Sequence, residues 1–361
     1  MPANFDLTAL AIKALAPSNE LIFDDKGIPS VMVKIPKATY AELGLGSSTN
    51  VFPAFIVGGT ARDYIYVSKY QNIVQGGRAY SLPGEDPANN IYGADALAAC
   101  TAKGHGWHLM TRMEWMALAL WCKKNGTQPK GNNDYGKDIG DSIYQAIPSC
   151  PRDSNGKIQR VATGTGPLSW SHDGTPSGVW DLNGNVWEWV GGIRFVNGEL
   201  QILENNDAAD SDISQALAST AWKAVNGSDG SLVTPNGSGT TSGCLRLDWT
   251  GSVWKWITGT ITEANKGAHD CSFESVAADS SVGTAATLLL QALGLLKYDS
   301  TAGAYLGDWF YMNNGEAERG LRCGGSWDAG ARAGVFDADG YRSFFSSRLT
   351  GIGFRSAYVE L

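Results

Sequence analysis

Short apolar runs separated by turn residues open the chain and predict strands. The runs at residues 21–23 and 31–33 flank the turn Asp24-Asp25-Lys26-Gly27. Two apolar runs on either side of a polar, glycine-containing turn are typical of a β-hairpin. Residues 1–50 are therefore expected to form a small N-terminal β module that serves in assembly or attachment.

From residue 52 the pattern changes to strands followed by two helices. The runs 55–57 and 64–67 predict strands, and a helix is expected over residues 94–103 because Gly104 ends it. A second helix is expected to begin at Thr111. Thr111 and Glu114 form a capping box, in which each side chain accepts from an otherwise unpaired backbone N–H. This order predicts an α+β domain over residues 51–361.

Residues 197–305 differ from their surroundings and are expected to be an insertion in that domain. Polar, turn-rich stretches occupy 226–228 and 236–239. Residues 245–256 alternate between apolar and polar, as a half-buried strand does. The apolar stretch 285–296 predicts a buried helix.

Composition narrows the function classes. The 361 residues carry a formal net charge of −8 and no basic block, which argues against a nucleic-acid partner. The 45 glycines and 13 tryptophans indicate a loop-rich fold anchored by aromatic side chains. The first 15 residues show no signal peptide, and the most apolar stretch is too short to cross a bilayer. No membrane insertion is expected.

The six cysteines are widely spaced and form no CxxC pair, so a zinc knuckle or a thioredoxin-type motif is not expected. Buried free thiols are the simpler interpretation. Cys244 and Cys271 both lie in the predicted insertion, where a disulfide between them stays an open alternative.

Three segments carry a resemblance to a known family. Residues 104–115 read GHGWHLMTRMEW, residues 178–189 read GVWDLNGNVWEW, and residues 321–327 read LRCGGSW, followed by GIGFR at 351–355. In this order they resemble the formylglycine-generating-enzyme, or sulfatase-modifying-factor, branch of the C-type lectin fold. The resemblance covers roughly residues 52–195 and 305–361. It implies a C-type lectin fold with an N-terminal β module and an insert.

Several aromatic and glycine residues in these segments are expected to form the framework of that fold. Trp187 and Trp189 are two residues apart, so they face the same side of a strand. Gly324 and Gly325 permit a close backbone approach before Trp327. The expected framework residues are Trp180, Trp187, Trp189, Gly324, Gly325, Trp327 and Phe354.

The enzymes of this fold use residues that the chain lacks. Formylglycine-generating enzymes place a reactive cysteine pair after the Gly-Gly-Ser segment, but no cysteine follows Cys323. Related non-heme iron enzymes use a His-x-x-x-His-x-Glu run, which His105 and His108 do not match. We therefore expect no catalytic residues, no metal site and no cofactor. A structural calcium ion near the oxygen-rich loop from Asp181 to Asn185 stays an open alternative.

The C-terminal segment, about 322–355, resembles the variable region of proteins diversified by retroelements, including the phage tropism determinants. In that family, adenines in Asn-type codons are randomised to NNC codons, which cannot encode Lys, Glu, Gln, Met or Trp. None of these five residue types occurs from Asp328 to Arg355, although the rest of the chain uses all of them. The resemblance thus implies a mutable contact surface.

The expected contact positions stand where the family carries Asn. Tyr and Arg dominate binding hot spots, and Phe is enriched in interface cores. Consecutive Phe344 and Phe345 cannot both face inward on one strand, so at least one is expected to be exposed. The full set is Asp328, Ala329, Arg332, Asp337, Asp339, Tyr341, Arg342, Phe344, Phe345, Arg348, Leu349 and Gly351.

Together these observations predict a non-catalytic receptor-binding protein, with a protein or glycan ligand on a bacterial cell surface. The missing signal peptide favours a phage tail protein of the virion, made in the host cytoplasm, and a homotrimer is one assembly that the N-terminal module allows. Two alternatives are an enzyme of the formylglycine-generating or non-heme iron class with relocated chemistry, and a plain structural phage protein.

Overall fold

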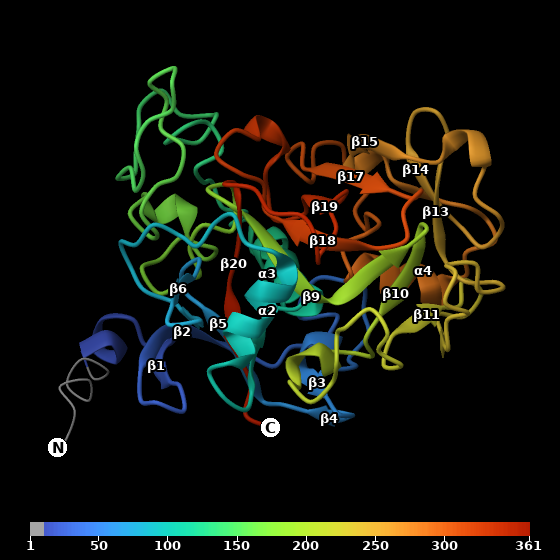
Figure 1. Cartoon of the computed structure of the whole chain (residues 1–361), viewed down its shortest axis with the longest axis horizontal. Coiled ribbons are helices and arrows are strands. Elements are labelled where there is room, and N and C mark those ends of the chain that lie inside the picture. The colour runs from blue at the N-terminus through green and yellow to red at the C-terminus, as the bar shows by residue number, and fades with distance from the viewer. Residues whose placement is uncertain (1–10) are drawn as a thin grey trace.

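Two β-sheets carry most of this chain, whose residues 11–361 are described by the computed structural model. The fold is mixed α and β, mostly sheet, and helices are few in the part of the chain described (Figure 1). The first sheet has five strands, in the spatial order β1 (Asn19–Phe23), β2 (Pro29–Pro36), β5 (Tyr64–Ser68), β21 (Ser356–Tyr358) and β8 (Trp107–Leu109).

The second sheet contains twelve strands and forms the scaffold of the candidate site. Its main path runs β15 (Ala268–Ser272), β17 (Trp309–Asn313), β19 (Ala338–Gly340), β18 (Arg319–Cys323), β9 (Trp187–Val196), β10 (Glu199–Ile202), β13 (Arg246–Trp249), β14 (Trp254–Ile257) and β16 (Ala277–Ala278). Strand β20 (Ile352–Phe354) pairs with β9, and β11 (Lys223–Val225) with β10 and β12 (Leu232–Val233). Two small hairpins complete the strands, β3 (Ile56–Val57) with β4 (Thr60–Ala61) and β6 (Ile73–Gln75) with β7 (Arg78–Tyr80).

Helices α2 (Gly93–Thr101), α3 (Arg112–Asn125) and α4 (Thr284–Ala292) pack around these sheets. Helix α3 starts with the predicted capping box, because the Thr111 side chain accepts from the Glu114 N–H and Glu114 accepts from the Thr111 N–H. It ends at Gly126, which has the left-handed conformation common after helices (φ 67°). Short 3₁₀ turns are η1 (Pro53–Phe55), η2 (Leu168–Trp170), η3 (Asp207–Ala209), η4 (Glu263–Asn265), η5 (Phe273–Ser275) and η6 (Gly330–Arg332).

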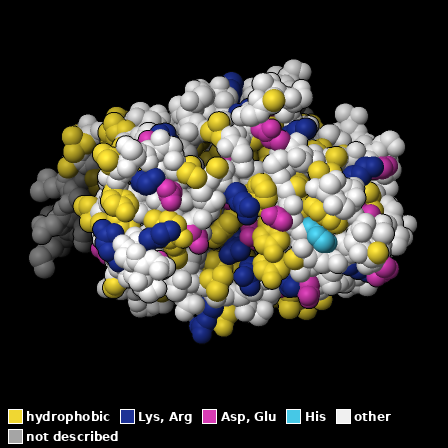
Figure 2. Space-filling view, turned by 90° about the horizontal axis from the view of Figure 1, so that it is seen from above, with side chains coloured by type: hydrophobic (Ala, Val, Ile, Leu, Met, Phe, Trp, Pro, Cys, Tyr) yellow, Lys and Arg dark blue, Asp and Glu magenta, His cyan; other side chains and the backbone are white. Residues whose placement is uncertain are grey.

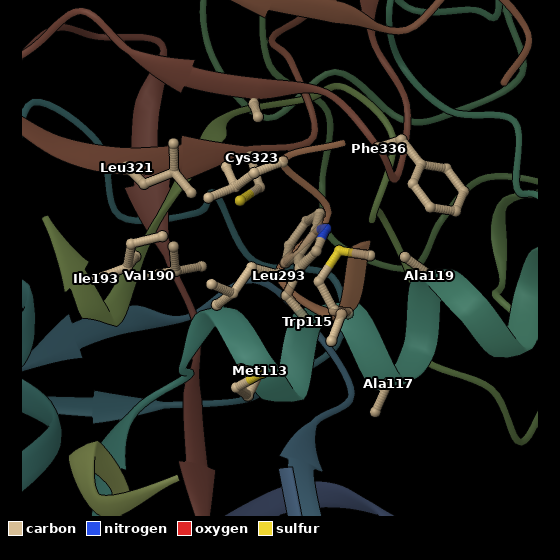
Figure 3. Packing of buried hydrophobic residues seen from close by; sticks show 14 of the residues in the cluster. Met113, Trp115, Ala117, Ala119, Val190, Ile193, Leu293, Leu321, Cys323 and Phe336 are labelled. Atoms are coloured by element: carbon tan, nitrogen blue, oxygen red, sulfur yellow. The ribbon is translucent and has the colours of Figure 1, made fainter. Parts of the chain in front are cut away.

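The main hydrophobic core lies between α3 and the second sheet. Figure 3 shows Trp115 of α3 close to Cys323 of β18 and to Leu293, which follows α4. Trp115 is 1% exposed and donates from its indole nitrogen to the Val335 carbonyl at 2.8 Å. Each large apolar side chain buried here stabilises the fold by about 1.5–3 kcal/mol. The core thus supports the inner face of the strands whose outer face is described below.

The N-terminal hairpin forms as predicted, but it is not a separate module. Strand β2 pairs with β5 along its whole length, from Met32 opposite Ser68 to Pro36 opposite Tyr64. Val33 belongs to the main hydrophobic core. The hairpin thus gains its stability from the rest of the chain, and the boundary at residue 50 stays a prediction. Residues 1–10 of the expected module lie outside the described residues, and its role in assembly stays a prediction.

The predicted insertion 197–305 is also built into a sheet. It supplies β10 to β16 of the second sheet, so it extends the domain's own scaffold. The alternating stretch 245–256 forms two strands, β13 and β14, with a turn between them. The predicted helix at 285–296 is found as α4, which ends earlier, at Ala292.

The structure also bears on the cysteines and on the apolar segments. All six cysteines are free thiols, so Cys244 and Cys271 do not pair. Within residues 11–361, no helix combines the length and the apolar character needed to cross a bilayer.

Candidate ligand-binding site

One face of the second sheet carries a row of polar and aromatic side chains across four strands. The strand register places Asp270 of β15 opposite Tyr311 of β17, and Tyr311 opposite Asp339 of β19. Asp339 in turn lies opposite Arg322 of β18. Residues directly opposite each other project from the same face of a sheet. Since the next residues along these strands are buried in the core over α3, this row lies on the outer face.

A cavity of about 610 Å³ opens over this row. Three aromatic side chains and four carboxyl groups contribute to its wall, with one arginine at its edge. The lining residues are Trp187, Asp270, Trp309, Tyr311, Ser326, Asp328, Ala329, Arg332, Asp337 and Asp339. Such a combination of aromatic walls and a few fixed polar groups is typical of a ligand site.

Asp337 is the least satisfied polar group of the cavity. Its side chain is 0% exposed, and neither of its carboxyl oxygens has a hydrogen-bond partner. Burial raises its pKa well above the usual value, and the neighbouring carboxyls of Asp308 and Asp339 raise the pKa further. Arg322 and Arg112 act in the opposite direction. These surroundings therefore favour the neutral form of Asp337.

Asp339 is fixed by partners on both sides. Arg322 donates to its carboxylate at 2.8 Å, and the Tyr341 N–H donates to the other oxygen at 2.9 Å. The Arg322 guanidinium also lies over the ring of Trp187, 4.8 Å from its centroid. Because these groups are nearly fully buried, the floor of the cavity is rigid and ordered before any ligand arrives.

The outer rim is built from a second set of linked side chains. The Trp309 indole donates to Asp270 at 2.8 Å, and Arg332 lies over the Trp309 ring at 4.3 Å. Arg332 is also 4.0 Å from Asp270. Beside them, Tyr311 and Tyr341 stack with ring centroids 4.8 Å apart and planes 10° apart. The rim therefore presents aromatic rings that are already held in place.

This face lies along the upper side of Figure 1, where β15 and β17 are labelled. Figure 2 looks down on that side and shows basic and hydrophobic side chains gathered near the centre of the face, with acidic side chains beside them. Arg342 over Tyr341 (4.5 Å) and Arg348 over Tyr92 (4.8 Å) are further contacts of the same kind. Interleaved Arg, Tyr and Trp are the residue types of binding hot spots.

The predicted contact positions fall into three groups. Asp328, Ala329, Arg332, Asp337 and Asp339 line the cavity. Tyr341 and Arg342 are half-buried beside it, Arg348 and Leu349 are exposed, and Phe345 is half-buried. The remaining positions, Phe344 and Gly351, belong to the core and the framework.

Phe344 and two of the acids differ from the expected surface positions. Phe344 is only 7% exposed and packs edge-on against Trp189, with ring centroids 5.6 Å apart, so it is a core residue. The expected strand through 344–345 is a turn, which is why both rings can pack inward. Asp337 and Asp339 are buried, although both belong to the residues that line the cavity.

Gly351 belongs to the framework as well. Its carbonyl accepts from the Trp187 N–H at 2.8 Å, where β20 joins β9. A Cβ at this position would lie 3.3 Å from the Trp327 ring, which is tight. A larger residue here must therefore displace Trp327.

The expected framework residues lie at close backbone approaches and in buried positions, and one of them, Trp187, also lines the cavity. Gly324 and Gly325 have φ values of 88° and 81°, and a Cβ on Gly325 would meet Ala333 at 2.4 Å. The other framework side chains are buried apart from Trp187, which is half-buried and lines the cavity. The buried framework aromatics are Trp180, Trp189, Trp327 and Phe354.

Reasoning from the sequence missed several residues of the site, among them Ser326 and Arg322. Asp270, Trp309 and Tyr311 form one wall of the cavity, and Asp308 is a buried acid that acts on Asp337. Asp270 lies in the segment interpreted as an insertion, far from residue 328 along the chain. The aromatic run at 309–311 was the one signal that could have pointed to this wall.

The four histidines have different surroundings and do not form one cluster. His108 is buried against Glu114 at 2.9 Å, and His269 stacks on Trp249 at 4.6 Å. Burial lowers the pKa of His172 to about 4, and its Nδ1 accepts from the Val179 N–H. His105 lies with two aspartates, Asp210 and Asp212, as a group of potential metal ligands, of which His105 and Asp212 are exposed.

Cys323 and the loop 181–185 bear on two alternatives, an enzyme with relocated chemistry and a structural calcium site. Burial raises the pKa of the Cys323 thiol to about 12, so it is not a ready nucleophile. In the loop, the Asn183 and Asn185 side-chain oxygens already accept hydrogen bonds from Asn133, Asn132 and Val161. Only Asp181 keeps an unpartnered carboxyl oxygen, which does not fit an ion that takes six to eight oxygen ligands.

Comparisons with known proteins give weak similarities only. No family model and no curated protein matches the sequence. Among solved structures, PvdO from Pseudomonas aeruginosa is 14% identical, with a TM-score of 0.35 over 94% of this chain and 98% of that chain. Two variants of a Major Tropism Determinant, P3c and U1, are 11% and 12% identical, with TM-scores of 0.32 and 0.31 over 94% of this chain and 71% of theirs. Similarities of this size assign neither fold nor function.

Proposed function

We propose that this protein recognises a ligand without chemically changing it, and that the ligand contacts the cavity over β15, β17 and β19 together with the loops of residues 328–349. The observation that carries the proposal is the cavity itself. It joins five of the predicted contact positions to a wall of Trp187, Trp309 and Tyr311.

The physical chemistry of the cavity supports recognition. Trp309 and Tyr311 are held by stacking and hydrogen bonds before binding, so little side-chain entropy is lost on contact. Large aromatic side chains contribute contact area, and the charged groups among them provide orientation. Neither carboxyl oxygen of Asp337 has a hydrogen-bond partner, so a ligand that supplies a donor would relieve the cost of burying it.

We further propose a C-type lectin fold of the formylglycine-generating-enzyme branch, diversified by a retroelement. The motifs at 178–189 and 321–327 support this fold, as does the pairing of the C-terminal β21 with the early strand β5. The absence of Lys, Glu, Gln, Met and Trp from residues 328–355 supports diversification. In this proposal the protein is a phage tail protein of the virion that binds a protein or glycan on a bacterial surface.

Two experiments test the proposal. The 3′ end of the gene is sequenced in sister isolates, together with the region downstream. We expect differences concentrated in codons 328–351, matched by a near-copy repeat that differs at adenines. Identical sequences throughout this segment, or differences spread evenly along the gene, would contradict diversification.

Binding is tested with fluorescently labelled protein on intact bacteria from the isolates that carry the gene. The double variant Trp309→Ala/Arg332→Ala is expected to lose most of the cell-bound signal, because it removes the stacked rim of the cavity. Ile28→Ala, on the exposed turn between β1 and β2, is the matched control and should bind as the parent does. Equal binding by all three proteins would show that the cavity is not the contact surface.

A further inference from the structure

The charges that line the cavity are strongly unequal. Four acidic residues line it, Asp270, Asp328, Asp337 and Asp339, against one lining arginine, Arg332, and Arg322, which pairs with Asp339 behind the wall. Aromatic faces and carboxyl groups both attract cations, the first through the quadrupole of the ring. The cavity as a whole therefore favours a positively charged group over a negative one.

Three of the four carboxyl groups are already engaged. Asp270 accepts from Trp309, Asp328 accepts from the Ser326 hydroxyl at 2.5 Å, and Asp339 accepts from Arg322. Asp337 alone has no partner for either oxygen. A buried acid without a hydrogen bond destabilises the folded state. The cavity therefore contains one acid that a ligand can satisfy.

Arg332 shows that the site accommodates a cation. Its guanidinium lies on Trp309 and points a nitrogen toward Asp270, while its side chain is 60% exposed. It lines the same cavity as Asp337. Asp337 itself is fully covered by its neighbours, so a charged group that enters beside the aromatic wall reaches this unpaired acid only when the lining side chains shift.

We propose that the cavity receives a primary ammonium group of the ligand, which pairs with Asp337 between the rings of Trp309 and Tyr311. This inference rests on the proposed function and names the chemistry that the site recognises. An ammonium is compact and directs its donors freely, so it suits a single deep carboxylate, whereas a guanidinium favours a bidentate partner at the surface. A lysine side chain and an amino sugar both offer such a group.

A metal ion fits the cavity less well. Within residues 11–361, three metal-ligating side chains come close together at His105, Asp210 and Asp212, and none of these lines this cavity. Here Asp339 is already neutralised by Arg322. One free carboxylate is too few ligands for a divalent cation.

Binding should release a proton. Without ligand, burial and the neighbouring acids Asp308 and Asp339 keep the pKa of Asp337 high, while Arg322 of β18 and Arg112 of α3 lower it. The Cys323 thiol, also on β18, interacts with the Asp337 charge and is itself neutral. An ammonium stabilises the ionised carboxylate, so affinity rises with pH until Asp337 is ionised in the free protein as well.

The test uses four probes on the full chain, measured by calorimetry and saturation-transfer NMR. Nα-acetyl-lysine amide and glucosamine carry the amine. Nα-acetyl-norleucine amide and N-acetylglucosamine are their neutral counterparts. We expect the amines to bind at least about tenfold more tightly than the neutral compounds. Binding of the lysine compound alone indicates a protein ligand, and binding of glucosamine alone indicates a glycan.

The variant Asp337→Asn removes the charge and keeps the shape. It is expected to lower amine affinity at least about tenfold and to abolish the rise in affinity between pH 5.5 and 8. The lysine compound is used for the pH series because its ammonium stays protonated throughout. Asp63→Asn, on an exposed carboxylate away from the cavity, makes the same substitution elsewhere and should bind as the parent does.

The outcomes separate this inference from the proposed function. Equal binding of neutral and charged probes, or amine binding that survives Asp337→Asn, overturns the ammonium site even where the parent protein binds cells. Thermal unfolding of Asp337→Asn confirms that the variant folds. If it does not fold, Trp309→Leu in the same titration replaces it, and unchanged amine affinity in that variant overturns the inference. Failure to bind cells overturns the proposed function, whatever the amines do.

Discussion

The buried ion pair between Glu188 and Arg355 is expected to be decisive for stability, and replacing Arg355 with Met tests this. Both side chains are 1% exposed. Arg355 donates to both Glu188 oxygens, at 2.6 and 2.5 Å, and also to the carbonyls of Ser68, Trp180 and Asp181. The pair joins the end of the contact segment, just after β20, to β9. Its loss should therefore loosen the C-terminal side of the site.

The size of the stability loss follows from the Glu188 carboxylate, which stays buried after Arg355 is replaced. In Arg355→Met, Glu188 keeps only the Gln71 amide as a side-chain donor, at 3.1 Å. Removing one member of a buried pair leaves an uncompensated charge and costs about 3–5 kcal/mol. That is a large share of the total stability of a typical domain, about 5–15 kcal/mol. The double variant Glu188→Leu/Arg355→Met should recover part of the loss, because neither charge remains buried.

Urea unfolding followed by tryptophan fluorescence measures these differences. Lys266→Met is the matched control, because it breaks an exposed pair with Glu263 (2.6 Å) that should contribute less than about 1 kcal/mol. If Arg355→Met loses no more stability than Lys266→Met, the reasoning is refuted. If the double variant is less stable than Arg355→Met, the charge-burial argument fails and packing explains the loss.

Three further predictions concern single residues. Phe344→Ala should lower the free energy of unfolding by about 3–5 kcal/mol and Phe345→Ala by clearly less, because only Phe344 is buried against Trp189. Urea unfolding measures both losses, and equal losses would refute this prediction. Burial raises the pKa of Asp181 to about 6, above its usual 3.8, so its contribution to stability is present below pH 3.8 and is lost as the pH rises through 6. The free energy of unfolding, measured relative to that of Asp181→Asn, should fall by about 3 kcal/mol across that window. A difference that does not change with pH would contradict this prediction. Thr111→Ala should cost about 1–2 kcal/mol in thermal unfolding, since it removes the cap of α3, and Thr111→Ser should restore most of it.

Elements whose chemistry is local could be predicted from the sequence. Thr111 and Glu114 specify the start of α3 because a capping box needs only residues three positions apart. The hairpin of β1 and β2 follows from a polar turn between two apolar runs. Gly324 and Gly325 were expected to allow a close approach, and their positive φ values do so.

The candidate site could be predicted only in part. Arg332 and Asp328 were placed in the contact segment by their codon pattern, and both line the cavity. Phe344 was assigned to the surface, since the sequence could not show that the segment turns and packs the ring on Trp189. The linear pattern of a loop does not say which of its side chains will meet the core.

Local structure follows from the sequence: where helices begin, where turns form and which segment resembles a mutable surface. The site, in contrast, exists only in the folded chain. Asp270 and Tyr311 reach Asp339 through strand pairing across long stretches of chain, and Asp337 loses its partners only because neighbouring strands bury it. The physical reason is that capping and turns depend on neighbours in sequence, whereas register and burial depend on contacts between distant residues.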